Sequence, residues 1–118
     1  MPTAWVTLSE ELDDLDYGVS QSLRDILAKY LSCRARCLDR NHIVLRCLKG
    51  SRTSMLADIE IEVSAQFYFS RHFNRDSRTE AISRSVSKLL GISCATWIKL
   101  TIVGYARVTS DGVSYFSN

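Results

Sequence analysis

Proline is almost absent from the 118-residue chain, and glycine is scarce. The single proline, Pro2, follows Met1 directly, and the five glycines do not gather into a phosphate-binding loop. The sequence also has no G-x-S-x-G nucleophile motif and no H-E-x-x-H zinc motif. These absences argue against the nucleotide-binding, hydrolase and metalloprotease classes that such motifs define.

Long hydrophobic runs are absent as well. No stretch approaches the roughly 18 apolar residues of a membrane span, and the first residues lack the basic and apolar regions of a secretory signal. The net charge of +2 is too low to indicate nucleic-acid binding. We therefore predict a cytoplasmic protein that binds neither nucleic acid nor a membrane.

Three of the four cysteines lie close to a histidine in the sequence. Cys33, Cys37, His42 and Cys47 have the spacing C-x3-C-x4-H-x4-C, which is similar to that of a zinc motif. However, residues 42–48 read as a continuous strand, which would separate the His42 and Cys47 Cα atoms by roughly 16 Å and place them on opposite faces. We therefore predict no metal site, and we expect reduced thiols that are mostly buried.

Hydrophobic periodicity divides the chain into alternating strands and amphipathic helices. Ser77 and Glu80 have the spacing of a capping box at the start of the second helix, and Gly91 is the expected stop after it. The Ser-Asp-Gly turn at 110–112 predicts a C-terminal hairpin. The expected strands are 3–8, 42–48, 56–69 and 94–103, and the expected helices are 16–31 and 77–90.

The order strand-helix-strand thus occurs twice in a chain that is long enough for one domain. We predict an α+β fold in which two β-α-β units form a four-stranded mixed sheet, with two helices on one face and a short C-terminal hairpin. A single domain then spans residues 1–118, with halves at about 1–50 and 51–118.

Residues 56–69 show the clearest alternation in the chain. Apolar side chains share one face of this strand, and Asp58, Glu60 and Glu62 share the other. Because the helices must cover the apolar face, the acidic row lies on the uncovered face. A long strand of this kind indicates a sheet that meets other subunits.

Arg75 and Arg78 flank the start of the second helix, where the helix dipole is already positive. Backbone N–H groups and two guanidiniums together predict an anion site, suited to a carboxylate or a phosphate. The alternative interpretation is that both arginines are solvated or paired with Asp76 and Glu80.

Pro2 offers a different kind of chemistry. We expect Met1 to be removed, which would leave Pro2 as a free secondary amine. An α-amino group titrates near ~8, and burial or a nearby arginine would lower its pKa towards the range of a general base. The simpler interpretation is that a Met-Pro start indicates only efficient removal of methionine. His42 and His72 lack an orienting carboxylate nearby in the sequence, so we interpret both as structural.

Three features together resemble the tautomerase superfamily: Pro2 at the start of the first strand, DRNHIV at 39–44 and NRDSRTEAI at 74–82. That superfamily includes macrophage migration inhibitory factor, 4-oxalocrotonate tautomerase, malonate semialdehyde decarboxylase and cis-3-chloroacrylic acid dehalogenase. As an architecture, the resemblance covers nearly the whole chain. It implies a homotrimer with sheets packed around a central channel, and a proton-transfer chemistry that needs no cofactor.

The resemblance also implies roles for individual residues. Pro2 matches the catalytic proline, and Asp39 matches an aspartate that orients substrate or water. Arg75 and Arg78 match arginines that bind a carboxylate. The other substrate-binding candidates are Arg40 beside Asp39, Arg36 or Arg34 in place of a lysine of the inhibitory factor, and Tyr105 or Tyr115 as the aromatic residue that closes a neighbouring subunit's pocket.

We therefore expect a tautomerase-like enzyme in which Pro2 moves a proton between carbon and oxygen of a small 2-keto or enol carboxylic acid. Arginines would hold the carboxylate and stabilise the enolate charge. Decarboxylation, or hydration with dehalogenation, would use the same groups. Two other hypotheses are a ferredoxin-like module that binds a small ligand without catalysis, and an inactive oligomer with the tautomerase fold.

Overall fold

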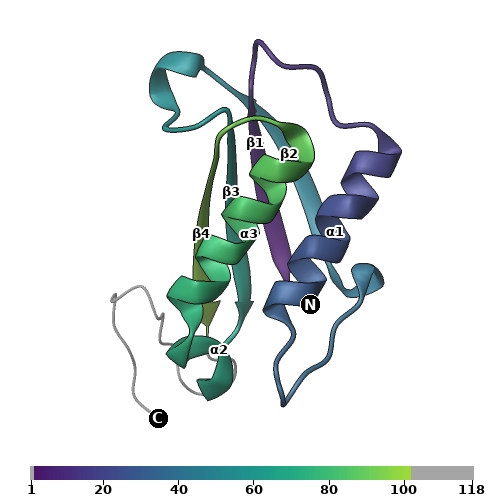
Figure 1. Cartoon of the computed structure of the whole chain (residues 1–118), viewed down its shortest axis with the longest axis vertical. Coiled ribbons are helices and arrows are strands. Elements are labelled where there is room, and N and C mark those ends of the chain that lie inside the picture. The colour runs from purple at the N-terminus through teal and green to yellow at the C-terminus, as the bar shows by residue number, and fades with distance from the viewer. Residues whose placement is uncertain (1, 102–118) are drawn as a thin grey trace.

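Two consecutive β-α-β units make up residues 2–101, the part of the chain that the computed structural model describes (Figure 1). The first unit contains β1 (Thr3–Ser9), α1 (Tyr17–Leu31) and β2 (Val44–Gly50). The second contains β3 (Ile59–Gln66), α3 (Arg75–Leu90) and β4 (Cys94–Thr101). The connections hold two short 3₁₀ turns and one short helix: η1 (Arg40–His42), η2 (Arg52–Ser54) and α2 (Phe69–Phe73).

The four strands form one mixed sheet in the order β2-β1-β3-β4. The two outer pairs are parallel and the central pair, β1 with β3, is antiparallel. Both long helices lie side by side on one face of the sheet (Figure 1). The predicted α+β fold is therefore confirmed, and the predicted C-terminal hairpin lies outside the described residues.

The strand order decides against the ferredoxin-like alternative. In that fold each β-α-β unit is split, with a strand of the other unit between its two strands. Here β1 pairs directly with β2, and β3 pairs directly with β4. The ferredoxin-like prediction is therefore wrong.

The core lies between the helices and the covered face of the sheet. Alternate residues of β1 and β3 point into it, and so do the apolar stripes of α1 and α3, as the periodicity predicts. Gly91 ends α3 with a φ of 70°, which confirms the predicted stop. The fully buried apolar residues include Val6, Leu23, Leu27, Ile59, Ile61, Ile82, Val86 and Leu100.

The open face of the sheet carries aromatic and charged side chains. In register across the four strands lie Arg46, Trp5, Glu62 and Trp97. Trp5 is 42% exposed and Trp97 is 44% exposed, while the Arg46 guanidinium lies 5.5 Å from the Trp5 ring centroid. Two large aromatic side chains in one row leave this face partly apolar.

β3 ends earlier than the alternation predicts. The Phe67 N–H still donates to the Thr101 carbonyl at 2.9 Å, but the Tyr68 carbonyl then accepts the N–H of Arg71, also at 2.9 Å. That bond turns the chain into α2. The predicted strand to residue 69 is therefore wrong at its end, and Phe69 is exposed instead of facing the core.

α3 begins two residues before the predicted start, and the predicted capping box is wrong. The Asn74 carbonyl accepts the Arg78 N–H at 3.0 Å, so Ser77 already lies inside the first turn. Glu80 does not reach back to Ser77 but pairs with Arg84, one turn further along the helix. The tight connection from α2 at Asn74 sets the start of α3, and no side-chain cap is present.

The first unit differs from the prediction only at the ends of its elements. The Asp16 carboxylate accepts the Val19 N–H at 2.7 Å, so α1 starts just after Asp16. β2 starts at Val44, two residues after the predicted start, because His42 belongs to η1 and Ile43 caps that turn. Asp39 caps η1, and its own N–H donates to Nδ1 of His42 at 3.0 Å.

Candidate functional site

Pro2 is buried directly before β1, a central strand of the sheet, and its carbonyl accepts the Val44 N–H at 2.9 Å. A pocket of about 230 Å³ opens beside it. The wall comes from the loop after α1, the end of β3 and the start of α2. The residues that line the pocket are Pro2, Arg36, Leu38, Gln66, Tyr68 and Arg71.

The loop after α1 brings Arg36 to this pocket. The Ser32 hydroxyl donates to the Ala28 carbonyl at 2.7 Å and accepts the Leu38 N–H at 2.9 Å, which closes the loop onto the helix end. Within the loop, Cys33 and Arg36 exchange two backbone hydrogen bonds of 2.9 and 3.0 Å. The structure therefore places the exposed Arg36 and the buried Pro2 on one pocket.

Arg71 is the most deeply buried charged residue described, with 2% of its surface exposed. Its Nε donates to the Leu31 carbonyl at 2.7 Å, and its Nη1 donates to the Gln66 carbonyl at 2.8 Å. The guanidinium lies 5.0 Å from the Tyr68 ring centroid. Burial lowers the pKa of Arg71, and the positive charges of Arg78 and Arg36 act in the same direction.

Sequence reasoning missed Arg71 as a pocket residue. It lies in the segment FYFSRHF, which directly follows the alternating strand. A cation inside an aromatic-rich segment was the available signal, because a charge among apolar side chains needs specific partners.

The Cys33 thiol is a second titratable group that interacts with Arg71. Burial raises the pKa of the Cys33 thiol, but hydrogen bonding to Ser70, to backbone groups and the charge of Arg71 outweigh it. The pKa of Cys33 therefore lies below its ordinary value.

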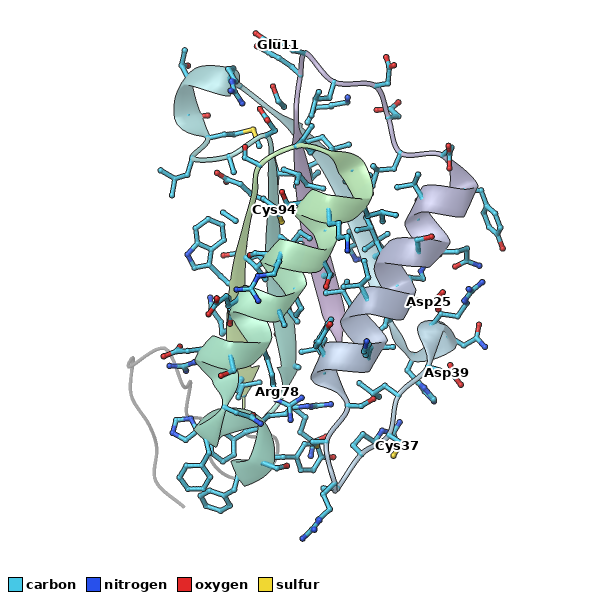
Figure 2. The ribbon with its side chains drawn as sticks, in the orientation of Figure 1. Glu11, Asp25, Cys37, Asp39, Arg78 and Cys94 are labelled. Atoms are coloured by element: carbon cyan, nitrogen blue, oxygen red, sulfur yellow. The ribbon has the colours of Figure 1, made fainter. Side chains whose placement is uncertain are left out.

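Arg78 is engaged by the end of α1 and does not line the Pro2 pocket. Its Nη1 donates to the carbonyls of Tyr30 and Ser32, at 2.6 and 2.7 Å, and its Nε donates to Oδ1 of Asn74 at 2.6 Å. Figure 2 shows Arg78 extending from the start of α3 towards α1. The last carbonyls of a helix lack partners within the helix, so a guanidinium satisfies them well.

Arg75 lies on a different and larger pocket, of about 500 Å³. That pocket is bounded by the first turn of α3, with Asp76, and by β4, with Trp97 and Lys99. Within one chain, the structure therefore separates Arg75 from Pro2 and from the carbonyls that hold Arg78.

Asp39 and Arg40 both stabilise the turn η1, and neither lines the Pro2 pocket. Asp39 Oδ1 accepts the Asn41 N–H at 2.8 Å. Arg40 binds Asp25 of α1 through two hydrogen bonds, of 2.9 and 2.5 Å. Figure 2 shows Asp25 and Asp39 on neighbouring segments. The predicted pocket residue Tyr105 lies outside the described residues.

No metal cluster is present among residues 2–101, where no three His, Cys, Asp or Glu side chains come together. Of the cysteines that suggested zinc, Cys33 is buried whereas Cys37 and Cys47 are exposed. In the same part of the chain, no helix combines the length and apolar character that a bilayer crossing needs.

We compared the chain with known protein families, curated proteins and solved structures. No protein-family model matches the chain, and no curated protein matches it. Among solved structures, a macrophage migration inhibitory factor-like protein from Entamoeba histolytica matches with a TM-score of 0.54 and 12% identity, over 88% of this chain and 90% of that one. The fold is therefore similar to that of a macrophage migration inhibitory factor-like protein.

A second solved structure, described as native Ps01740, gives the same result. It matches with a TM-score of 0.55 and 9% identity, over 86% of this chain and 95% of its own. The tautomerase-like fold predicted from the sequence is therefore confirmed over most of the chain. At these identities the likeness establishes the fold, and the site is argued from this chain's own residues.

We expect Arg78→Met to lower the free energy of unfolding by about 1.5–3 kcal/mol, the range for a hydrogen bond to a charged group. The reason is that the carbonyls of Tyr30 and Ser32 lose their donor. Arg84→Met is the matched control on the same helix: it breaks only the exposed pair with Glu80, which is worth less than about 1 kcal/mol. Urea unfolding of both variants measures the difference, and equal effects would contradict this role for Arg78.

The pKa of Asp25 tests whether Arg40 binds this carboxylate. Hydrogen bonds from Arg40 hold this pKa below its ordinary value of 3.8. The pair therefore stabilises the fold above that value, and the stabilisation is lost as the pH falls through the folded-state pKa. We expect the pKa of Asp25 to rise towards its ordinary value in Arg40→Met, as measured by carboxyl NMR titration. An unchanged pKa would show that Arg40 is directed elsewhere.

Proposed function

We propose that the chain is a cofactor-independent, tautomerase-like enzyme that acts on a small 2-keto or enol carboxylic acid. Its base is the secondary amine of Pro2 after removal of Met1. The observation that carries the proposal is the pocket in which the buried Pro2 meets Arg36 and Arg71, with no carboxylate among the six lining residues. A neutral amine beside two guanidiniums suits an anionic substrate that loses a proton.

The electrostatics of the pocket support a base that works near neutral pH. An α-amino group ordinarily titrates near ~8. Burial and neighbouring positive charge both disfavour its protonated form. We therefore expect the pKa of the Pro2 amine to lie below that value, so that a large fraction is unprotonated at pH 7.

Arg36 is the group we assign to the substrate carboxylate. It is exposed, and no ion pair within residues 2–101 uses its guanidinium. Arg71 contributes charge from behind, while its hydrogen bonds to the main chain hold the pocket wall. In this proposal Arg78, Arg40 and Asp39 support the structure of one chain instead of touching the substrate, and Arg75 lies on the other pocket.

The proton transfer balances within the substrate and Pro2. The amine nitrogen takes a proton from the carbon next to the substrate carbonyl, and the C–H electrons form the enolate. The proton then passes to the enolate oxygen, which gives the enol and restores the amine; the reverse sequence gives the keto acid. Positive charge near the oxygen stabilises the enolate, the state of highest negative charge.

A homotrimer is part of the same proposal. The open face of the sheet carries Trp5 and Trp97 in one row, with Arg46 and Glu62 as partners of opposite charge. Contact between copies would bury the aromatic surface and pair the charges. The hypothesis of an inactive oligomer makes the same use of this face, so activity decides between the two.

The enol form of phenylpyruvate is the test substrate. We expect the mature chain to convert it to the keto form, and Pro2→Ala to lose at least ~10²-fold in kcat/KM, the usual contribution of a general base. Mass spectrometry must first show that Met1 is absent from both proteins. A mature wild-type protein without turnover would exclude this activity, and a trimeric mass for it would favour the inactive oligomer.

A further inference from the structure

We infer that Tyr68 donates a hydrogen bond to the carbonyl or enolate oxygen of the substrate, opposite Pro2 in the same pocket. This inference rests on the proposed function and assigns the group that binds the reacting oxygen. It also places that group on the chain that supplies the base, so that a single pocket wall orients both ends of the substrate.

The backbone fixes the position of Tyr68. The residue follows β3 with φ −138° and ψ 142°, and its carbonyl accepts the N–H groups of Arg71 and His72, both at 2.9 Å. These bonds hold the junction between the strand and α2. Tyr68 therefore stands on an anchored point of the pocket wall, not on a free loop tip.

The ring of Tyr68 packs against the Arg71 guanidinium. The Arg71 guanidinium lies 5.0 Å from the ring centroid, within the range of a cation–π contact. Arg71 cannot move away without giving up the Leu31 and Gln66 carbonyls. The phenol is thus pre-organised, which is what stabilisation of a developing oxyanion requires.

The Tyr68 hydroxyl is the neutral donor best placed for this role. Within residues 2–101, no hydrogen bond uses that hydroxyl, although the residue is half-buried and lines the pocket. Pro2 and Leu38 offer no side-chain donor. Gln66 offers an amide, but its side chain is exposed and belongs to the polar row of β3.

The hydroxyl leaves the proton balance of the reaction unchanged. Pro2 takes the proton from carbon, negative charge grows on the substrate oxygen, and Tyr68 keeps its own proton while donating to that oxygen. A donor that acts on developing charge lowers the barrier more than it strengthens ground-state binding. Its loss should therefore appear in kcat, whereas loss of the carboxylate partner Arg36 should appear mainly in KM.

The test is Tyr68→Phe, which removes the hydroxyl and keeps the ring over Arg71. With the enol form of phenylpyruvate, we expect kcat to fall by about 10²–10³-fold, the range for one oxyanion donor, with KM changed by less than about twofold. Tyr17→Phe is the matched control, because Tyr17 is 76% exposed and its hydroxyl accepts from Gln21 on α1. That variant should keep wild-type kinetics.

The outcomes separate this inference from the proposed function. If Pro2→Ala is inactive while Tyr68→Phe keeps the wild-type kcat, the role of Tyr68 is wrong and the proposed function stands. If Tyr68→Phe raises KM and leaves kcat unchanged, the hydroxyl acts in ground-state binding, and the inference is also wrong. Absence of turnover by the wild-type protein would contradict both the role of Tyr68 and the proposed function. A midpoint temperature of thermal unfolding equal to that of the wild type establishes that the Tyr68→Phe variant is folded.

Discussion

The guanidinium of Arg71 joins the end of α1 to the end of β3, and the pocket beside Pro2 depends on that junction. Burying a charge is costly unless hydrogen bonds compensate for lost hydration. Here the compensation comes from the Leu31 and Gln66 carbonyls, which end a helix and a strand and need donors. The same bonds hold the pocket wall at the ends of α1 and β3.

A second arginine completes this junction and raises its positive charge. Arg78 binds the carbonyls of Tyr30 and Ser32, so two guanidiniums fasten the last turn of α1. Arg36 follows on the loop that this turn begins. Burial, together with the positive charges of Arg78 and Arg36, lowers the pKa of Arg71.

The sequence was sufficient for the architecture because periodicity reports burial. It predicted the strands, both long helices and the stop at Gly91. It failed at the end of β3, where a local backbone turn begins. The alternation continues through Phe69, although the bond from Arg71 N–H to the Tyr68 carbonyl has already turned the chain. Arg75 and Arg78 are three residues apart on α3, a spacing that places them near one face. However, carbonyls at the end of α1 hold the Arg78 guanidinium, whereas Arg75 lines the pocket beside β4. Arg36 was predicted as a site residue only from the family resemblance.

The protonation of Pro2 is the property on which the proposed chemistry depends most directly. A ¹⁵N NMR titration of the mature chain, labelled at proline, follows this one nitrogen because the sequence has no other proline. Burial and the nearby guanidiniums predict a pKa below the ordinary α-amino value of ~8. A pKa at or above that value would contradict the account, because the amine would then be mostly protonated at neutral pH and could not act as the base.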